Sequence, residues 1–91
     1  MFYNVLLDYV FMRYTIVMNS SANPKSQQKF GENLREIRSS LQLSQEEVAK
    51  ASGISVTYYA GIERGEENPT FAVIENICKA LKVKSEQVLP F

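Results

Sequence analysis

The sequence has 91 residues, which is room for one domain with a shallow core. It contains one cysteine and no histidine, so an intrachain disulfide and a cysteine-based zinc site are excluded and the usual catalytic proton shuttle is missing. Ten basic and ten acidic residues give a net charge of zero. Because Lys and Arg supply most non-specific affinity for phosphate, a nucleic-acid partner would have to be recognised through the distribution of charge, not its total.

The first 26 residues form an apolar extension, residues 1–18, and a polar linker with one proline, residues 19–26. Asp8 and Arg13 interrupt the extension and no basic region precedes it, which argues against a secretory signal, and it is too short and too charged to cross a bilayer. Its apolar spacing favours an amphipathic helix, whereas its β-branched and aromatic content favours a strand. Two interpretations stay open: an added or upstream-translated segment, or a segment that packs on a partner subunit.

Residues 27–91 show helical periodicity and no strand pattern, so we expect one all-α domain of five helices. The first helix covers about 27–41. Ser44 and Glu47 predict a capping box at the start of the second helix. Gly53 is expected to end this helix, because glycine readily takes the left-handed conformation of a C-terminal cap.

The remaining helix boundaries follow from the same capping logic. Ser55 and Thr70 are the predicted N-caps of the third and fourth helices. The third helix is expected to run to about Arg64, with Gly65 as its stop, and a final turn or short helix follows Ser85. The residues expected to face the core are Phe30, Leu34, Ile37, Leu41, Phe71, Ile74, Ile77, Cys78 and Leu81.

The segment Gln45–Gly65 has the layout of a helix-turn-helix, in which a short helix, a tight turn and a second short helix follow one another. Ala49 is small where the two helices would cross, and Gly53 permits the turn. The apolar wedge expected to fix the angle between the helices consists of Val48, Ile54, Tyr59 and Ile62. This wedge would let the second helix project outward.

Two stretches in this region, LSQEEVAKASGIS and GIERGEENPTF, resemble the lambda-repressor-like, Xre-type helix-turn-helix family. The resemblance covers Phe30 to about Leu89. It implies a five-helix domain that binds double-stranded operator DNA as a homodimer, without cofactor, metal or catalysis. Within the family, Thr57 and Tyr58 followed by the Gly61–Arg64 block are most similar to controller proteins of restriction–modification systems.

The resemblance also implies a DNA-binding surface. Its residues are Gln45, Ser55, Val56, Thr57, Tyr58, Gly61, Arg64 and Asn68. Gln45 and the N-terminus of its helix would grip a phosphate, and Asn68 would contact another phosphate from a loop. The first turn of the third helix would enter the major groove, with Gly61 on the same exposed face leaving room for DNA. Arg38 and Glu63 match a buried ion pair between the first and third helices.

This sequence departs from the family pattern at two places. The wedge residue Tyr59 is bulkier than the usual Ile or Val, and its hydroxyl needs a partner or water. The reading surface lacks Arg, Gln or Asn for bidentate base contacts. Val56 and Thr57 can instead contact thymine methyl groups, so we expect a T·A-containing site that is recognised partly through DNA deformability.

A homodimer would place two recognition helices about one helical turn (~34 Å) apart on a palindromic site. The expected dimer surface contains Val83, Val88, Leu89 and Phe91. The alternative is a protein-interaction module of the same fold, such as an antitoxin. The carboxylates Glu66 and Glu67 are expected to point away from DNA or toward a protein partner. No enzymatic constellation and no small-molecule effector domain is visible, and we expect a cytoplasmic protein.

Overall fold

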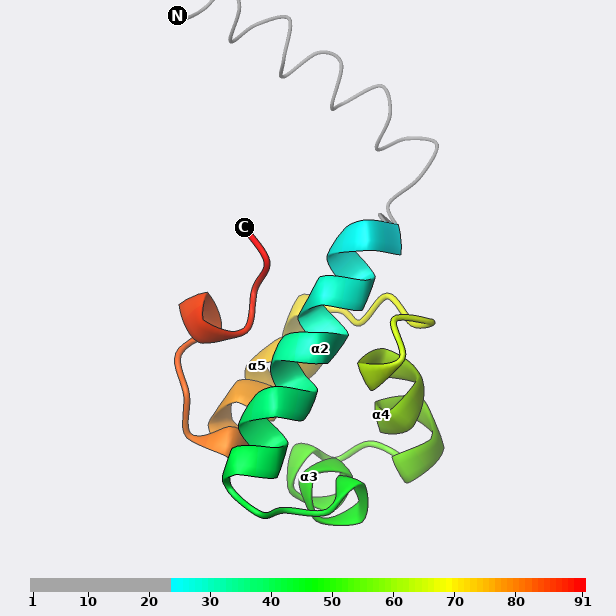
Figure 1. Ribbon diagram of the computed structural model, residues 1–91. Coiled ribbons are helices and arrows are strands. Elements are labelled where there is room, and N and C mark those ends of the chain that lie inside the picture. Colours follow the sequence, from blue (N-terminus) through cyan, green and yellow to red (C-terminus); the bar gives the residue numbers. More distant parts are fainter. Residues whose placement is uncertain (1–23) are drawn as a thin grey trace, which may run out of the picture.

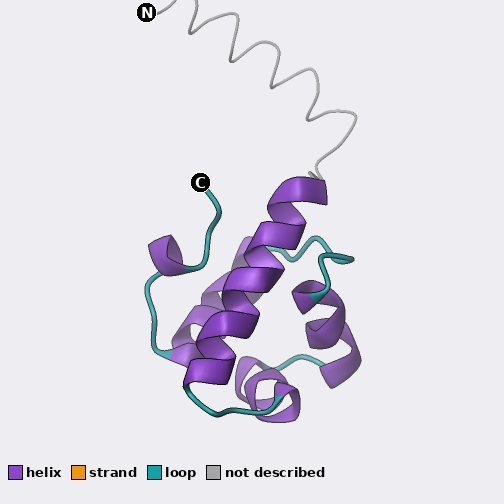
Figure 2. Ribbon diagram, in the orientation of Figure 1, coloured by secondary structure: helices purple, strands orange, loops and turns teal. Residues whose placement is uncertain are grey.

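The computed structural model describes residues 24–91, which fold into four α-helices and one turn of 3₁₀-helix (Figures 1 and 2). The predicted extension, residues 1–18, lies outside the described residues. Helix α2 spans Pro24–Ser40, so it begins three residues before the predicted start. Proline suits a first helical position because its missing N–H has no partner there in any case. Leu41, predicted to face the core, is 47% exposed, since the helix ends at Ser40 and the chain turns at Gln42 with a φ of 58°.

Helix α3 spans Gln45–Ser52 and has both of its predicted caps. The Ser44 hydroxyl accepts a hydrogen bond from the Glu47 amide at 3.0 Å, and the Glu47 carboxylate accepts one from the Ser44 amide at 2.7 Å. Gly53 ends the helix at a φ of 76°, the left-handed conformation that glycine takes without strain. The capping box and the turn of the helix-turn-helix are therefore confirmed.

Helices α4, Val56–Glu63, and α5, Phe71–Leu81, begin behind the predicted N-caps. Ser55 accepts from the Tyr58 amide at 3.1 Å and Thr70 accepts from the Val73 amide at 3.2 Å. After α5, Lys82 takes a left-handed φ of 58°, and the chain forms only one 3₁₀ turn, η1, over Ser85–Gln87. The fifth helix is therefore a single turn, not an α-helix.

The core lies where these elements meet: α3 packs on α4 and α5, and α2 packs on α4 (Figure 1). Besides Leu41, two predictions about it were wrong. Phe71 was expected inside but is 87% exposed, because it is the first residue of α5 and lies at the end of the helix, away from the buried Ile77 and Leu81. Val88 was expected at a dimer surface but is fully buried. The buried apolar residues are Phe30, Leu34, Val48, Ala49, Tyr59, Ile62, Ile77, Cys78, Leu81 and Val88.

Two contacts that the sequence did not predict join α2 to the rest of the domain. The Asn33 side chain donates from Nδ2 to the Val88 carbonyl oxygen at 2.8 Å, which ties α2 to the C-terminal turn. A Cβ atom on Gly31 would lie 2.3 Å from the carbonyl oxygen of Glu63 and 2.6 Å from that of Ile62. The backbones of α2 and α4 can approach this closely only because residue 31 is glycine. Along the described part of the chain, every helix is too short or too polar to cross a membrane.

Candidate nucleic-acid interface

The first turn of α4 lies on the surface of the domain, while the opposite side of the same helix is buried. Val56 is 38% exposed, and Thr57 is exposed beside it. Tyr59 and Ile62 are 0% and 1% exposed, respectively. The inner side of the helix is therefore packed in the core and its N-terminal turn is accessible from solvent, as in a recognition helix.

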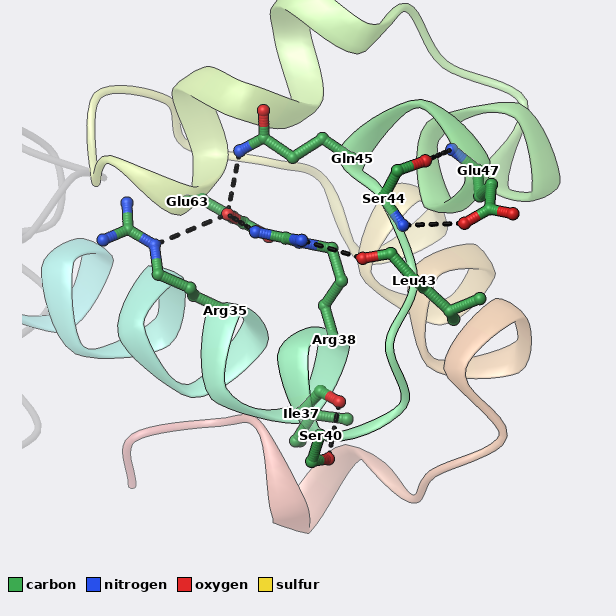
Figure 3. Close-up of polar contacts among 9 residues, drawn as sticks. All are labelled: Arg35, Ile37, Arg38, Ser40, Leu43, Ser44, Gln45, Glu47 and Glu63. Atoms are coloured by element: carbon green, nitrogen blue, oxygen red, sulfur yellow. Dashed lines mark hydrogen bonds and ion pairs between the residues drawn. The ribbon is translucent and has the colours of Figure 1, made fainter.

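The inner side of α4 ends in a polar cluster centred on Glu63, whose side chain has no exposed area (Figure 3). Arg38 of α2 binds this carboxylate through both ends of its guanidinium group, Nε to Oε2 at 2.6 Å and Nη2 to Oε1 at 3.1 Å. The remaining Arg38 nitrogen donates to the Leu43 carbonyl oxygen at 2.8 Å. The ion pair expected from the resemblance is thus present, and its arginine also holds the turn between α2 and α3.

Two further side chains approach the same carboxylate. Gln45 Nε2 donates to Glu63 Oε1 at 2.9 Å. Arg35 Nε lies 3.6 Å from that oxygen, and the Arg35 side chain is 56% exposed. Gln45 was expected to grip phosphate, whereas here it joins α3 to α4. An amide NH₂ group carries two hydrogens, so this bond uses one donor, and the phosphate contact stays a prediction.

The charge of Glu63 is stabilised by these bonds. Burial alone would raise the pKa of Glu63, but its polar neighbours, the bidentate Arg38 above all, lower it below its ordinary value. Removing one partner of a buried ion pair costs about 3–5 kcal/mol, because the other charge stays behind unpaired. The cluster therefore fixes how α4 sits on α2 and α3.

Tyr59, the departure from the family pattern, is buried beside this cluster. Its hydroxyl makes no hydrogen bond, although Glu63 and Arg38 lie nearby. Burial, and then the neighbouring Glu63 carboxylate, raise the pKa of Tyr59 strongly. The phenol is therefore kept neutral, and the ring fills the wedge position with its full volume. Ser52 is a second buried hydroxyl without a partner.

Gly61 was predicted to lie on an exposed face, and this was wrong, whereas its role in leaving room for DNA stays a prediction. The residue is buried. A Cβ on Gly61 would lie 2.9 Å from Cγ and 3.3 Å from Oε2 of Glu67, so the Glu67 side chain lies over this position of α4. The space that glycine creates is thus occupied by an acidic side chain of the same chain.

The helix-turn-helix segment and the loop after α4 together carry a net negative charge. Arg64 Nη2 binds Glu66 Oε1 at 3.0 Å, with both side chains more than half exposed. Residues 44–70 contain the cations Lys50 and Arg64 and five glutamates, which gives a net charge of −3. Asn68 is exposed in this loop and its phosphate contact stays a prediction.

The predicted dimer residues are divided between core and surface. Val88 belongs to the core, Val83 and Leu89 are half-buried, and Phe91 is 90% exposed. A shallow groove between α5 and the C-terminal segment is lined mainly by Phe71, Ile74, Cys78, Val83 and Leu89. Phe71, which lines this groove, is 87% exposed, and the C-terminal residue Phe91 is almost fully accessible as well. Within residues 24–91, no cluster of three His, Cys, Asp or Glu side chains could hold a metal ion.

The chain is similar to a helix-turn-helix family and to several control proteins. The helix-turn-helix family matches residues 34–88. The control protein C.BamHI of Bacillus amyloliquefaciens is 41% identical over 63 residues, which are 68% of this chain and 78% of that protein. The control protein C.SmaI of Serratia marcescens is 38% identical over 58 residues, 64% of this chain and 69% of that protein. The crystal structure of the restriction–modification controller protein C.AhdI from Aeromonas hydrophila matches with a TM-score of 0.68 and 36% identity, covering 69% of this chain and 96% of that chain.

Proposed function

The chain belongs to the helix-turn-helix family of transcriptional regulators, and from that premise we propose that it binds a palindromic DNA operator as a homodimer and is not an enzyme. The observation that carries this proposal is the arrangement of α4. Its inner side is fixed by Tyr59, Ile62 and the Glu63 cluster, while Val56 and Thr57 remain accessible on its first turn. We place its action in the cytoplasm, where such operators lie.

The proposed reading surface consists of Ser55, Val56, Thr57 and Tyr58. Val56 and the methyl group of Thr57 can contact thymine methyl groups in the major groove, and the Thr57 hydroxyl can make one hydrogen bond. Tyr58 packs partly against the core, so its ring is held in place at the edge of this surface. These chemistries favour an operator with T·A pairs at the contacted positions and with deformable steps elsewhere.

The proposed dimer surface is the groove beside α5 together with the two accessible phenylalanines. One chain offers one recognition helix, and a two-fold dimer is needed to place two of them on one palindrome. Phe71 and Phe91 are 87% and 90% exposed, and a second copy of this surface would cover both. This revises the predicted set: Phe71 joins Val83, Leu89 and Phe91, and Val88 leaves it.

Selection from random duplex DNA, read by sequencing, tests the proposal. We expect a palindrome whose half-sites are centred about one helical turn (~34 Å) apart, with affinity falling steeply as salt rises. Sedimentation of the protein alone is expected to give a dimer that dissociates on dilution. Weak binding that is indifferent to sequence would contradict the proposal.

The second candidate is a protein-interaction module, such as an antitoxin, and one observation favours it. The helix-turn-helix segment is negatively charged, and two accessible phenylalanines lie elsewhere on the domain. The double variant Val56→Ala with Thr57→Ala separates the two functions. If the protein binds an operator, this variant loses operator affinity. If the protein is an interaction module, the variant still binds its protein partner, and the wild type shows no preferred operator.

A further inference from the structure

We propose that Glu66 and Glu67 act as a built-in electrostatic restraint on DNA binding, which holds Arg64 away from phosphate and lowers affinity for duplexes of every sequence. This inference rests on the proposed function and deepens it. It assigns a role to the acidic loop, which that function does not use. Its evidence is the placement of the two carboxylates relative to the reading surface.

The Glu67 side chain lies on the recognition helix, one turn beyond Thr57. Residues four apart on an α-helix share a face, so Gly61 lies on the same face as Thr57, about 6 Å further along the axis. Glu67 covers Gly61, with its Oε2 atom 3.3 Å from where a Cβ would stand. A duplex that contacts Thr57 therefore brings its phosphates close to this carboxylate.

Glu66 acts through Arg64, the cation at the end of α4. The two side chains form an ion pair at 3.0 Å, and the negative charge of Glu67 is also felt at Arg64. An arginine whose charge is already compensated releases fewer counterions when it meets a phosphate. The pair thus removes one cation from the interface, and Glu67 adds a second negative charge that Arg64, already paired with Glu66, only partly offsets.

The test is the double variant Glu66→Gln with Glu67→Gln, which keeps side-chain size and removes both charges. We expect about tenfold tighter binding at ~0.1 M salt, equally for the selected operator and for a scrambled duplex. The slope of log K against log salt should steepen by about 0.9, the value for one additional phosphate contact. The matched control is Glu36→Gln with Glu86→Gln, which changes net charge equally at exposed positions of α2 and η1.

A second measurement isolates Arg64. In the wild-type protein, Arg64→Gln should change affinity about twofold or less, because Glu66 already compensates this charge. In the double-glutamine background the same substitution should remove most of the gain in affinity and restore the original salt slope. Equal effects of Arg64→Gln in the two backgrounds would overturn the proposal.

The outcomes separate this inference from the function beneath it. If the wild-type protein selects an operator but the double variant matches the control variant in affinity and salt slope, the restraint is refuted and the regulator function stands. If the wild-type protein binds no duplex at either low or high salt, both are refuted. A steeper slope in the double variant only, with uniform tightening, supports both.

Discussion

The two sides of helix α4 differ in burial and in contacts, although they belong to the same eight residues. The inner side is buried, and Glu63 accepts hydrogen bonds there from Arg38 and Gln45. The outer first turn carries Val56 and Thr57, which remain accessible. The inner side therefore determines whether the helix is held in place, and the outer side determines what it can bind.

The largest expected effect is on the inner side, at Arg38. Arg38→Ala leaves Glu63 buried without its bidentate partner and should lower the free energy of unfolding by about 3–5 kcal/mol. The control is Arg35→Ala, which removes an arginine near the same carboxylate but one that is 56% exposed. It should cost less than about 1 kcal/mol. Chemical denaturation at one fixed protein concentration measures the stability of both variants. Equal losses would contradict the expectation that the buried pair stabilises the fold more than the exposed arginine does.

Gly31→Ala should give the next largest loss, about 3 kcal/mol in the free energy of unfolding. Alanine gains up to about 1 kcal/mol over glycine in helix propensity. However, its Cβ would stand 2.3 Å from a backbone oxygen of α4, which cannot rotate away as a side chain would. Gly53→Ala is the comparison: nothing lies within 4 Å of its Cβ, and only the φ of 76° is unfavourable, costing about 1–2 kcal/mol. A stabilised Gly31→Ala protein would disprove the close approach of α2 and α4.

Stability should fall at both ends of the pH range. The folded-state pKa of Glu63 lies below the ordinary 4.5, so its contribution is full above that pH and is lost as the pH falls further. The folded-state pKa of Tyr59 lies above the ordinary 10.0, so stability is lost as the pH rises beyond 10.0. Melting temperatures at pH 3, 7 and 11 measure the loss of stability at acid pH (the acid limb) and at alkaline pH (the alkaline limb).

Tyr59→Phe tests whether the Tyr59 hydroxyl causes the loss of stability at alkaline pH, because it removes the hydroxyl and keeps the ring. Since the Tyr59 hydroxyl makes no hydrogen bond, this variant should lose little stability near neutral pH. Its melting temperature should fall less than that of the wild type between pH 7 and 11, with the acid limb unchanged. An identical alkaline fall in both proteins would assign that limb to other groups.

The smallest effect on stability is expected on the outer side. Val56→Ala with Thr57→Ala should change the free energy of unfolding by less than about 1 kcal/mol, because both side chains are accessible. Operator affinity, in contrast, should fall at least tenfold with the loss of both base contacts. Ser39→Ala, an exposed helical position on α2, is the control. An unfolded double variant would contradict the separation of the two sides.

Local signals predicted most of the fold. Ser44, Ser55 and Thr70 cap their helices as expected, and Gly53 ends α3, because these effects depend on a few adjacent residues. The errors arose where the outcome depends on distant parts of the chain. Leu41 and Phe71 fit the helical periodicity but lie at helix ends, beyond the reach of the core.

The candidate site was predicted less completely, for the same reason. The resemblance supplied the Arg38–Glu63 pair, but the bond from Gln45 joins residues eighteen apart and leaves no local pattern. The close approach at Gly31 carried a signal, since a glycine inside a helix often marks backbone contact. Nothing in the sequence indicated that Glu67 folds back over Gly61.

Operator selection carried out in parallel with the wild-type protein and with the Val56→Ala, Thr57→Ala variant shows whether the first turn of α4 reads DNA. We predict that the wild type enriches a palindrome with T·A pairs at fixed positions in each half-site. The variant should lose preference at those positions while its melting temperature stays the same. If both proteins enrich the same sequence, or neither enriches any, the first turn of α4 is not the reading surface.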